Sequence, residues 1–195
     1  MKNLNFVLFL MLLCVSASIA GVADDGILSE GEYYGGMITL NSESLLVIGG
    51  GAYLIEAEDD SYIEVRYTST PVSSKTGIQN IYLLDNSNLL FLDGAVDGIT
   101  LYKDSTAILK GGDIDSITIK HRPQDSCYVT ICCQVGYTMD STGISGLWED
   151  GTPFDIDFID YSPYTTCDYV NIVVVPEPAT LVLLGIGSLL IRRKK

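Results

Sequence analysis

Two neighbouring 18-residue segments of this chain align with each other without a gap. They are residues 81–98 (IYLLDNSNLLFLDGAVDG) and residues 99–116 (ITLYKDSTAILKGGDIDS). Weaker copies of the pattern lie upstream from Ile38, and an insertion near residues 69–79 separates them from the clear pair. A fixed period of this length is typical of proteins in which each repeat stacks on the previous one. The matched positions are Ile81 with Ile99 and Ile117, Leu83 with Leu101 and Ile119, Ser87 with Ser105, Phe91 with Leu109, Gly94 with Gly112, and Val96 with Ile114.

Alternation inside each repeat predicts strands. Apolar residues stand two apart at Ile81 and Leu83, and again at Leu89 and Phe91, which is the period of a strand with one buried face. Asn-Ser, Asp-Ser and Gly-Gly pairs between them mark corners. We therefore expect an all-β fold in which residues 21–123 form a short parallel β-solenoid (a β-helix) of about 4–5 coils, with three short strands in each coil.

Residues 124–175 do not repeat the pattern. A strand beginning near Cys127, a β-hairpin around Asp150 and Gly151, and a last hydrophobic strand over residues 169–175 are predicted. We expect this C-terminal β region to pack antiparallel against the open end of the solenoid, because an unfinished stack leaves a sheet edge exposed.

Both ends of the chain carry targeting features. Lys2, an apolar stretch over residues 4–15 and the small residues of Ser18-Ile19-Ala20 predict a signal peptide over residues 1–20, with cleavage after Ala23 as the alternative. At the other end, an apolar run is long enough for a helix of about 20 Å. The hydrocarbon core of a membrane is about 30 Å thick, so this helix is short for a permanent span. The terminal cations would place the C-terminus in the cytoplasm and the rest of the chain outside. This C-terminal segment, residues 176–195, has three elements. The first is the turn Pro176, Glu177 and Pro178, and the second is the apolar run 179–191, which is predicted to form a short transmembrane helix. The third is the group of terminal cations Arg192, Arg193, Lys194 and Lys195.

That C-terminal pattern resembles the PEP-CTERM sorting signal of exopolysaccharide-producing Gram-negative bacteria. The resemblance implies recognition by an exosortase and cleavage near the Pro-Glu-Pro turn. The protein would then be exported, pass through a transient form anchored in the inner membrane, and end at the cell surface or in the extracellular matrix. Exopolysaccharide is a candidate binding partner, and an ordinary single-pass anchor is the alternative reading. Residues 144–156 (ISGLWEDGTPFDI) also resemble a region found before the sorting signal in an uncharacterised group of PEP-CTERM proteins with Gly-Gly and Asn-Ser solenoid repeats.

The exported part is strongly acidic. Residues 21–175 hold 6 Lys and Arg against 24 Asp and Glu, a net charge of −18. A charge of this sign excludes nucleic acid and anionic membrane surfaces as binding partners.

Four cysteines, Cys127, Cys132, Cys133 and Cys167, fall in the exported part and are disulfide candidates. Two connectivities are realistic, since a bond between the adjacent Cys132 and Cys133 would be strained. Zinc is the weaker alternative, because the chain has one histidine and no Cys-x-x-Cys spacing.

Pairs of acids two residues apart, Asp113 with Asp115 and Asp155 with Asp157, share a strand face and are weak calcium candidates. They lack the loop motifs of known calcium sites, so a solvated acidic face is favoured, and neither a metal site nor a cofactor is predicted. Paired catalytic carboxylates would instead indicate a polysaccharide-cleaving enzyme.

His121 is expected at the surface and Trp148 in the core. The sequence favours a non-enzymatic structural or adhesive protein. The alternatives are a small glycan-binding module with exposed Tyr and Trp, and a polysaccharide-active β-helix enzyme. An exposed aromatic ladder at 18-residue spacing would favour the first alternative, and a cleft with two carboxylates the second.

Overall fold

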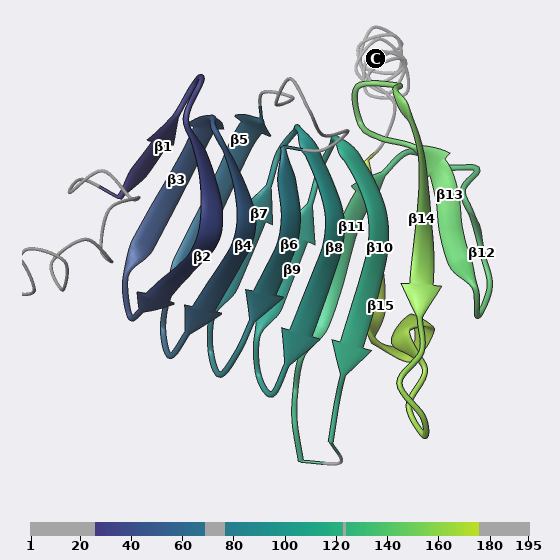
Figure 1. Cartoon of the computed structure of the whole chain (residues 1–195). Helices are drawn as coiled ribbons and strands as arrows, with labels where there is room; N and C mark the ends of the chain where they lie inside the picture. The colour runs from purple at the N-terminus through teal and green to yellow at the C-terminus, as the bar shows by residue number, and fades with distance from the viewer. Residues whose placement is uncertain (1–25, 69–76, 123, 176–195) are drawn as a thin grey trace, which may run out of the picture.

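The computed structural model describes residues 26–68, 77–122 and 124–175. The predicted signal peptide and the segment from Pro176 to the C-terminus lie outside these residues. The regular secondary structure of the described part is almost entirely β-strand (Figure 1), with one short 3-10 helix, η1 (Thr166–Tyr169). Within it, no helix has the length and apolar character that crossing a membrane requires.

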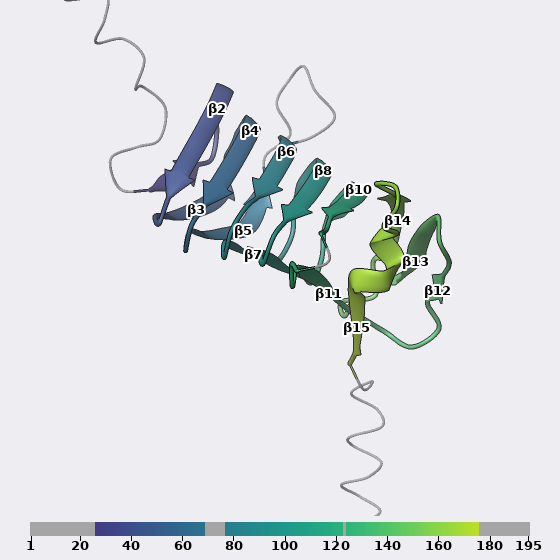
Figure 2. The same cartoon turned by 90° about the horizontal axis from the view of Figure 1, so that it is seen from below.

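The strands form two sheets, and successive strands of the chain alternate between them through most of the molecule (Figures 1 and 2). The seven-stranded sheet has the order β1 (Ile27–Ser29), β3 (Ser44–Gly49), β5 (Tyr62–Thr68), β7 (Asn88–Phe91), β9 (Thr106–Leu109), β11 (Tyr128–Cys133) and β15 (Val170–Val174). The eight-stranded sheet has the order β12 (Thr138–Met139), β13 (Gly143–Leu147), β14 (Pro153–Ile159), β10 (Asp113–Lys120), β8 (Ala95–Tyr102), β6 (Ile78–Leu83), β4 (Gly51–Glu58) and β2 (Tyr33–Asn41).

The 18-residue period is the spacing between paired strands. In the eight-stranded sheet Ile81 pairs with Ile99, and Ile99 pairs with Ile117, all in parallel strands. In the seven-stranded sheet Phe91 pairs in the same way with Leu109. The predicted columns are therefore confirmed, because each repeat lies beside the equivalent residues of the next.

Each repeat contains two strands, where three were expected. A third strand would need a further corner in each repeat, but Asp97 and Gly98 lie inside the single strand β8. Val96 and Ile99 on either side of them are both buried. Asp97 and Gly98 are thus two consecutive outward-facing residues within one strand. The strand bends at this point, but the chain makes no turn.

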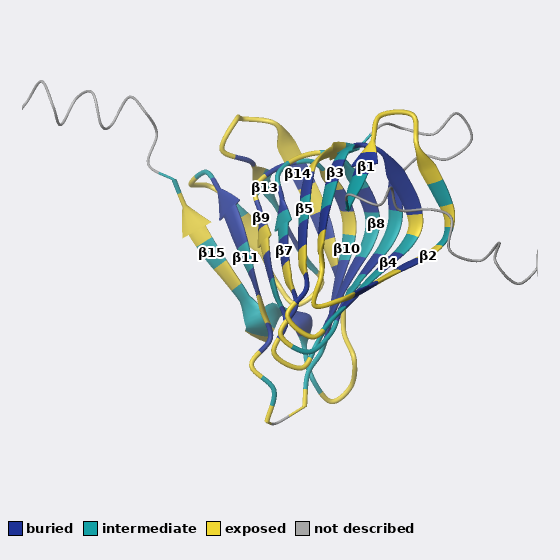
Figure 3. Ribbon diagram, turned by 90° about the vertical axis from the view of Figure 1, so that its left-hand side faces the viewer, coloured by how far each residue is buried: buried dark blue, intermediate teal, exposed yellow. Residues whose placement is uncertain are grey.

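The core lies between the two sheets and consists of the inward-facing apolar side chains of successive repeats. Figure 3, seen from the β1 and β2 end, shows buried residues along the strands of both layers, interspersed with exposed and intermediate ones. Ser87 and Ser105 are also fully buried at a corner. The Ser105 hydroxyl accepts a hydrogen bond from the backbone N–H of Tyr102 at 3.2 Å, and it thereby satisfies an amide of the turn. Ser87 Oγ has no hydrogen-bond partner among the described residues.

The corners that follow β2, β4, β6 and β8 share one backbone conformation. Each holds a non-glycine residue with a φ near +55°, a region that costs L-residues energy. The repeated glycines Gly94 and Gly112 also have positive φ, of 112° and 86°, which explains why glycine recurs in that column. The four non-glycine positions are Ser42, Asp59, Asp85 and Lys103.

The C-terminal β region is only partly antiparallel. The hairpin β13–β14 forms around Gly151 as predicted, and β12 adds to it in antiparallel pairing. However, β14 pairs in parallel with β10, and β11 pairs in parallel with both β9 and β15. Val129 and Ile131 of β11 repeat the inward spacing of the β9 residues that they pair with, so β11 continues the stack. The expectation of a wholly antiparallel cap was therefore wrong for β11, β14 and β15.

Candidate functional site

Two of the predicted acidic residues lie beside a shallow hollow on the C-terminal hairpin. Asp155 and Asp157 of β14 line a cavity of about 240 Å³ together with Asp140 and the hydroxyl groups of Thr138 and Ser145. Register places Thr138, Ser145 and Asp155 in one row across three strands, and the two hydroxyl oxygens are 2.9 Å apart. The other pair, Asp113 and Asp115 on β10, does not line the hollow.

One carboxylate at the hollow is already used by the local backbone. Asp140 Oδ1 accepts hydrogen bonds from the backbone N–H of Thr142 at 2.7 Å and from its hydroxyl at 2.6 Å. These bonds hold the pKa of Asp140 below its ordinary value, and they use the carboxylate to close a tight turn. Among the described residues, no group of three or more His, Cys, Asp or Glu side chains is arranged to hold a metal ion.

The predicted disulfides are not confirmed. Cys127, Cys132, Cys133 and Cys167 are all free thiols. The first three lie along or beside the extended strand β11, so the Cα atoms of Cys127 and Cys132 are about 16 Å apart. A disulfide requires a Cα separation of about 4.4–6.8 Å. Both connectivities expected from the sequence join Cys127 to Cys132 or to Cys133, and this fold accommodates neither.

His121 has a cysteine neighbour that the sequence did not reveal. Its Nδ1 lies 3.8 Å from Cys127 Sγ, and its ring packs against Tyr169 with centroids 4.3 Å apart. Burial raises the pKa of the Cys127 thiol to about 11. A nucleophilic cysteine needs a lowered pKa so that the thiolate forms. The pair is therefore a packed structural contact and lacks the electrostatics of a catalytic dyad.

Trp148 is a core residue, as expected. It is fully buried, stacks on Phe154 with centroids 4.3 Å apart, and donates its indole N–H to the carbonyl oxygen of Gly112 at 2.9 Å. It is consequently not available to stack on a ligand.

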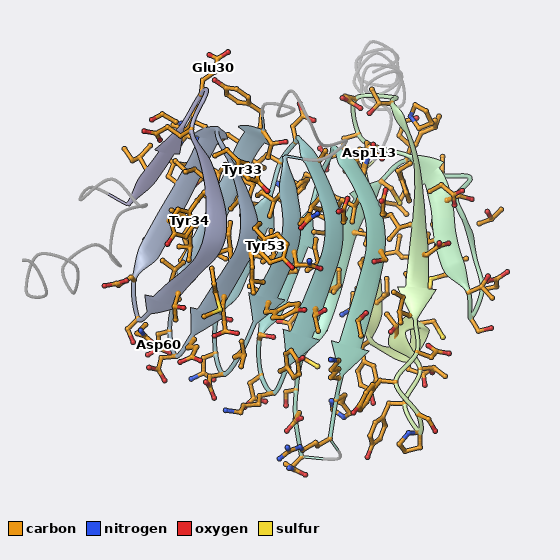
Figure 4. All side chains as sticks on the ribbon, in the orientation of Figure 1. Glu30, Tyr33, Tyr34, Tyr53, Asp60 and Asp113 are labelled. Atoms are coloured by element: carbon orange, nitrogen blue, oxygen red, sulfur yellow. The ribbon has the colours of Figure 1, made fainter. Side chains whose placement is uncertain are left out.

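Exposed tyrosines occur on the outer face of the eight-stranded sheet without forming an 18-residue ladder. Tyr33 and Tyr53 are about half exposed near the β2 end (Figure 4). Farther along, Tyr82 of β6 pairs with Thr100, and the next tyrosine is Tyr102, one row away. The residue that pairs with Tyr82 on the neighbouring strand is therefore not a tyrosine, and no ladder of stacked rings forms there.

One outward row combines aromatic rings with a cation. Tyr102 of β8 and Lys120 of β10 are direct neighbours in register, and Lys120 Nζ donates to Tyr102 Oη at 2.9 Å. The same Nζ lies 5.1 Å from the centroid of the Tyr102 ring and 5.4 Å from that of Tyr161. We call Tyr102, Lys120 and Tyr161 the tyrosine–lysine row. Sequence reasoning missed it because Tyr161 comes from the non-repeating region; the spacing of 18 between Tyr102 and Lys120 was the available signal.

The end of the described chain leads directly into the predicted sorting segment. β15 lies at the edge of the seven-stranded sheet (Figure 2), and the backbone N–H of Val175 donates to the carbonyl of Cys133 at 3.2 Å. Residues 174–195 match the family model of the PEP-CTERM protein-sorting motif. The chain carries a PEP-CTERM sorting motif. The resemblance noted from the sequence is thereby confirmed, and Pro176, Glu177, Pro178 and the cations Arg192 to Lys195 all fall inside the match.

The PEP-CTERM motif marks this chain as an exported protein that is targeted to an exosortase. No curated protein and no solved structure matches the chain.

Proposed function

We propose that this PEP-CTERM protein is a non-catalytic structural or adhesive component of the cell surface or extracellular matrix. The observation that carries the proposal is the sorting motif, which begins where the last strand of a folded β domain ends. In this proposal an exosortase cleaves the chain near Pro176-Glu177-Pro178. The short anchor is thereby removed, and the folded domain remains outside the cell.

The proposed framework is a short parallel β-solenoid. Its support is the alternation of strands between two sheets, with parallel neighbours and an 18-residue offset. Stacked repeats present long, regular outer faces and need no cleft. Such faces suit display or adhesion, and the high acidic charge keeps an exported domain soluble.

A non-catalytic role is supported by the state of the groups that could act as nucleophiles or acids. Burial raises the pKa values of the Cys127, Cys132 and Cys133 thiols, which keeps them protonated at neutral pH. Asp140, the third carboxylate at the hollow, is occupied by the turn that it caps. A carboxylate acting as a general acid would instead need a raised pKa.

The sorting step is tested by measuring the intact mass of the protein recovered from the host cell surface or medium. The wild-type protein should lack the residues that follow the Pro-Glu-Pro turn. A P176A/P178A variant should stay in the membrane fraction with its C-terminus intact. Pro153 offers a matched control, because P153A changes an exposed proline outside the motif and should be processed normally. A surface form that still carries Arg192 to Lys195 would contradict the proposal.

The adhesive role is tested separately with a host strain that lacks this chain. The strain should adhere less well to surfaces, or form a weaker matrix, and the wild-type chain should restore the property. Unchanged adhesion and matrix in the deletion strain would count against this role even if processing occurs as expected.

A further inference from the structure

The tyrosine–lysine row lies on the outer surface of the eight-stranded sheet, where β8, β10 and the chain after β14 run side by side (Figure 1). The Tyr161 end of the row is fixed by a tight turn, in which Tyr161 and Tyr164 exchange backbone hydrogen bonds of 3.2 and 2.8 Å. Asp160, just before that turn, accepts a hydrogen bond from the backbone N–H of Thr166 at 2.9 Å. The row is therefore held by regular strand pairing on one side and by an anchored turn on the other.

Lys120 differs in its partners from the two cations that form ion pairs within the described residues. Arg66 is paired with Glu64, and Lys103 is paired with Asp85. Within the described residues, Lys120 forms no ion pair with a carboxylate, and its contacts are with tyrosines. An ammonium group has three donors, and the contact with Tyr102 uses one, which leaves donors for an anionic ligand. The hydrogen bond to Tyr102 raises the pKa of Lys120, so the cation persists at neutral pH.

The rings around Lys120 supply a second kind of contact. Tyr161 is 55% exposed, and its ring centroid lies 5.4 Å from Lys120 Nζ. Tyr82 extends the aromatic surface through an edge-on contact with Tyr102, with ring centroids 6.5 Å apart. An exposed phenol ring can pack against the apolar face of a sugar ring, while its hydroxyl bonds to sugar hydroxyls.

We propose that the tyrosine–lysine row is a binding site for an acidic sugar residue, with the sugar carboxylate on Lys120 and the sugar ring against Tyr161. The lysine selects for the negative charge, and the tyrosines select for a flat ring with a partly apolar face. Polyanions whose charges are packed more closely than one per sugar residue, such as polyphosphate, are disfavoured, because the net charge of −18 repels them more strongly over long range. The proposal goes beyond the structural role above and relies only on the surface being outside the cell.

The test measures binding of three probes to the full-length protein in a mild detergent, by isothermal titration calorimetry. The probes are an oligogalacturonate, a neutral malto-oligosaccharide of the same length, and polyphosphate. We expect the wild-type protein to bind the oligogalacturonate best. K120Q should weaken that binding about tenfold, the usual effect of losing a hydrogen bond to a charged group, while K120R should retain most of it. Y161A should weaken it by about five- to tenfold through loss of stacking.

K110Q is the matched control, since Lys110 is exposed at a corner beyond β9 and its loss changes the net charge equally. It should leave the affinity unchanged, and circular dichroism should be the same for all variants. Equal binding of the neutral sugar, stronger binding of polyphosphate, or no binding of oligogalacturonate would each overturn the proposal. So would an unchanged affinity in K120Q. These outcomes leave the processing and adhesion experiments untouched, so failure of this site is distinguishable from failure of the proposed role.

Discussion

The indole N–H of Trp148 donates a hydrogen bond to the carbonyl oxygen of Gly112 at 2.9 Å, joining residues that are 36 positions apart in the chain. Gly112 belongs to the 18-residue repeats, and Trp148 belongs to the C-terminal hairpin. One buried side chain thus fastens the non-repeating region to the end of the repeating one, and the contact with Phe154 packs it there.

Replacing Trp148 with Phe should destabilise the protein by about 2–3 kcal/mol, because the Gly112 carbonyl loses a buried donor and the smaller ring leaves a cavity. Urea denaturation measures the change. The neighbouring Leu147 is 42% exposed, so L147A should cost less than about 1 kcal/mol. If W148F costs no more than L147A, the anchoring role is wrong.

Replacing Ser42 with Gly should stabilise the protein by about 0.5–1 kcal/mol. Ser42 has a φ of 59°, which penalises an L-residue and not glycine, and the penalty exceeds the entropy that glycine adds to the unfolded chain. S44G is the matched control, because Ser44 begins the strand β3, where glycine should destabilise by a similar amount. Thermal unfolding of the two variants should show midpoint shifts of opposite sign, and shifts of the same sign would contradict the strain argument.

Alkaline pH should reveal the buried Cys127 thiol. Burial raises its pKa from 9.0 to about 11, so the folded state holds the proton more tightly than the unfolded state. The stabilisation is complete below pH 9 and is lost as the pH rises towards 11. The thermal midpoint of the wild-type protein should therefore fall more steeply over that window than that of C127A, while the difference between the two stays constant below pH 8. Parallel curves across the whole range would show that the thiol is not buried in this way.

Among the described strands β15 lies at the edge of its sheet, and this edge should promote self-association of the protein. Val173 is 46% exposed on this edge strand, and an apolar edge is a template for pairing with another chain. V173K should reduce association at high concentration, measured by light scattering, with little loss of stability. I172K is the control, since Ile172 packs against the core and a lysine there should destabilise the fold. Equal association of V173K and the wild-type protein would argue against an exposed edge.

The repeats were predictable because their columns are visible as pairs such as Ile81 and Ile99, and a parallel stack must align them. The number of strands per repeat could not be predicted in the same way. Asp97-Gly98 has the composition of a corner, and only the burial of Val96 and Ile99 reveals that the chain bends there within one strand. The C-terminal pairing was missed for a related reason. Alternation in β11 and β14 specifies strands, but it carries no information on whether a neighbour runs parallel or antiparallel.

The candidate sites show the same division. The sorting residues could be predicted because a local run of residues defines the motif. The tyrosine–lysine row depends on Tyr161 returning beside Lys120 after 41 residues, which no local pattern specifies. The disulfide expectation is not confirmed: cysteine counts carry no distances, and the extended strand β11 separates Cys127 from Cys132 and Cys133.

The most direct test of the stacked-repeat architecture compares two deletions. Removing residues 81–98 joins Asn80 to Ile99. Ile99 then takes the place of Ile81, its partner in the neighbouring strand, and the residues that follow are shifted in the same way. Because the stability of stacked repeats is nearly a sum of repeat and neighbour terms, this deletion should remove one increment and leave a soluble β-rich protein. Removing residues 81–89 joins Asn80 to Leu90, which turns apolar side chains outward and should cause aggregation. Circular dichroism and gel filtration on both variants decide the matter: we predict that only the 18-residue deletion folds, and if both fold or both collapse, the 18-residue repeat is not the unit of this structure.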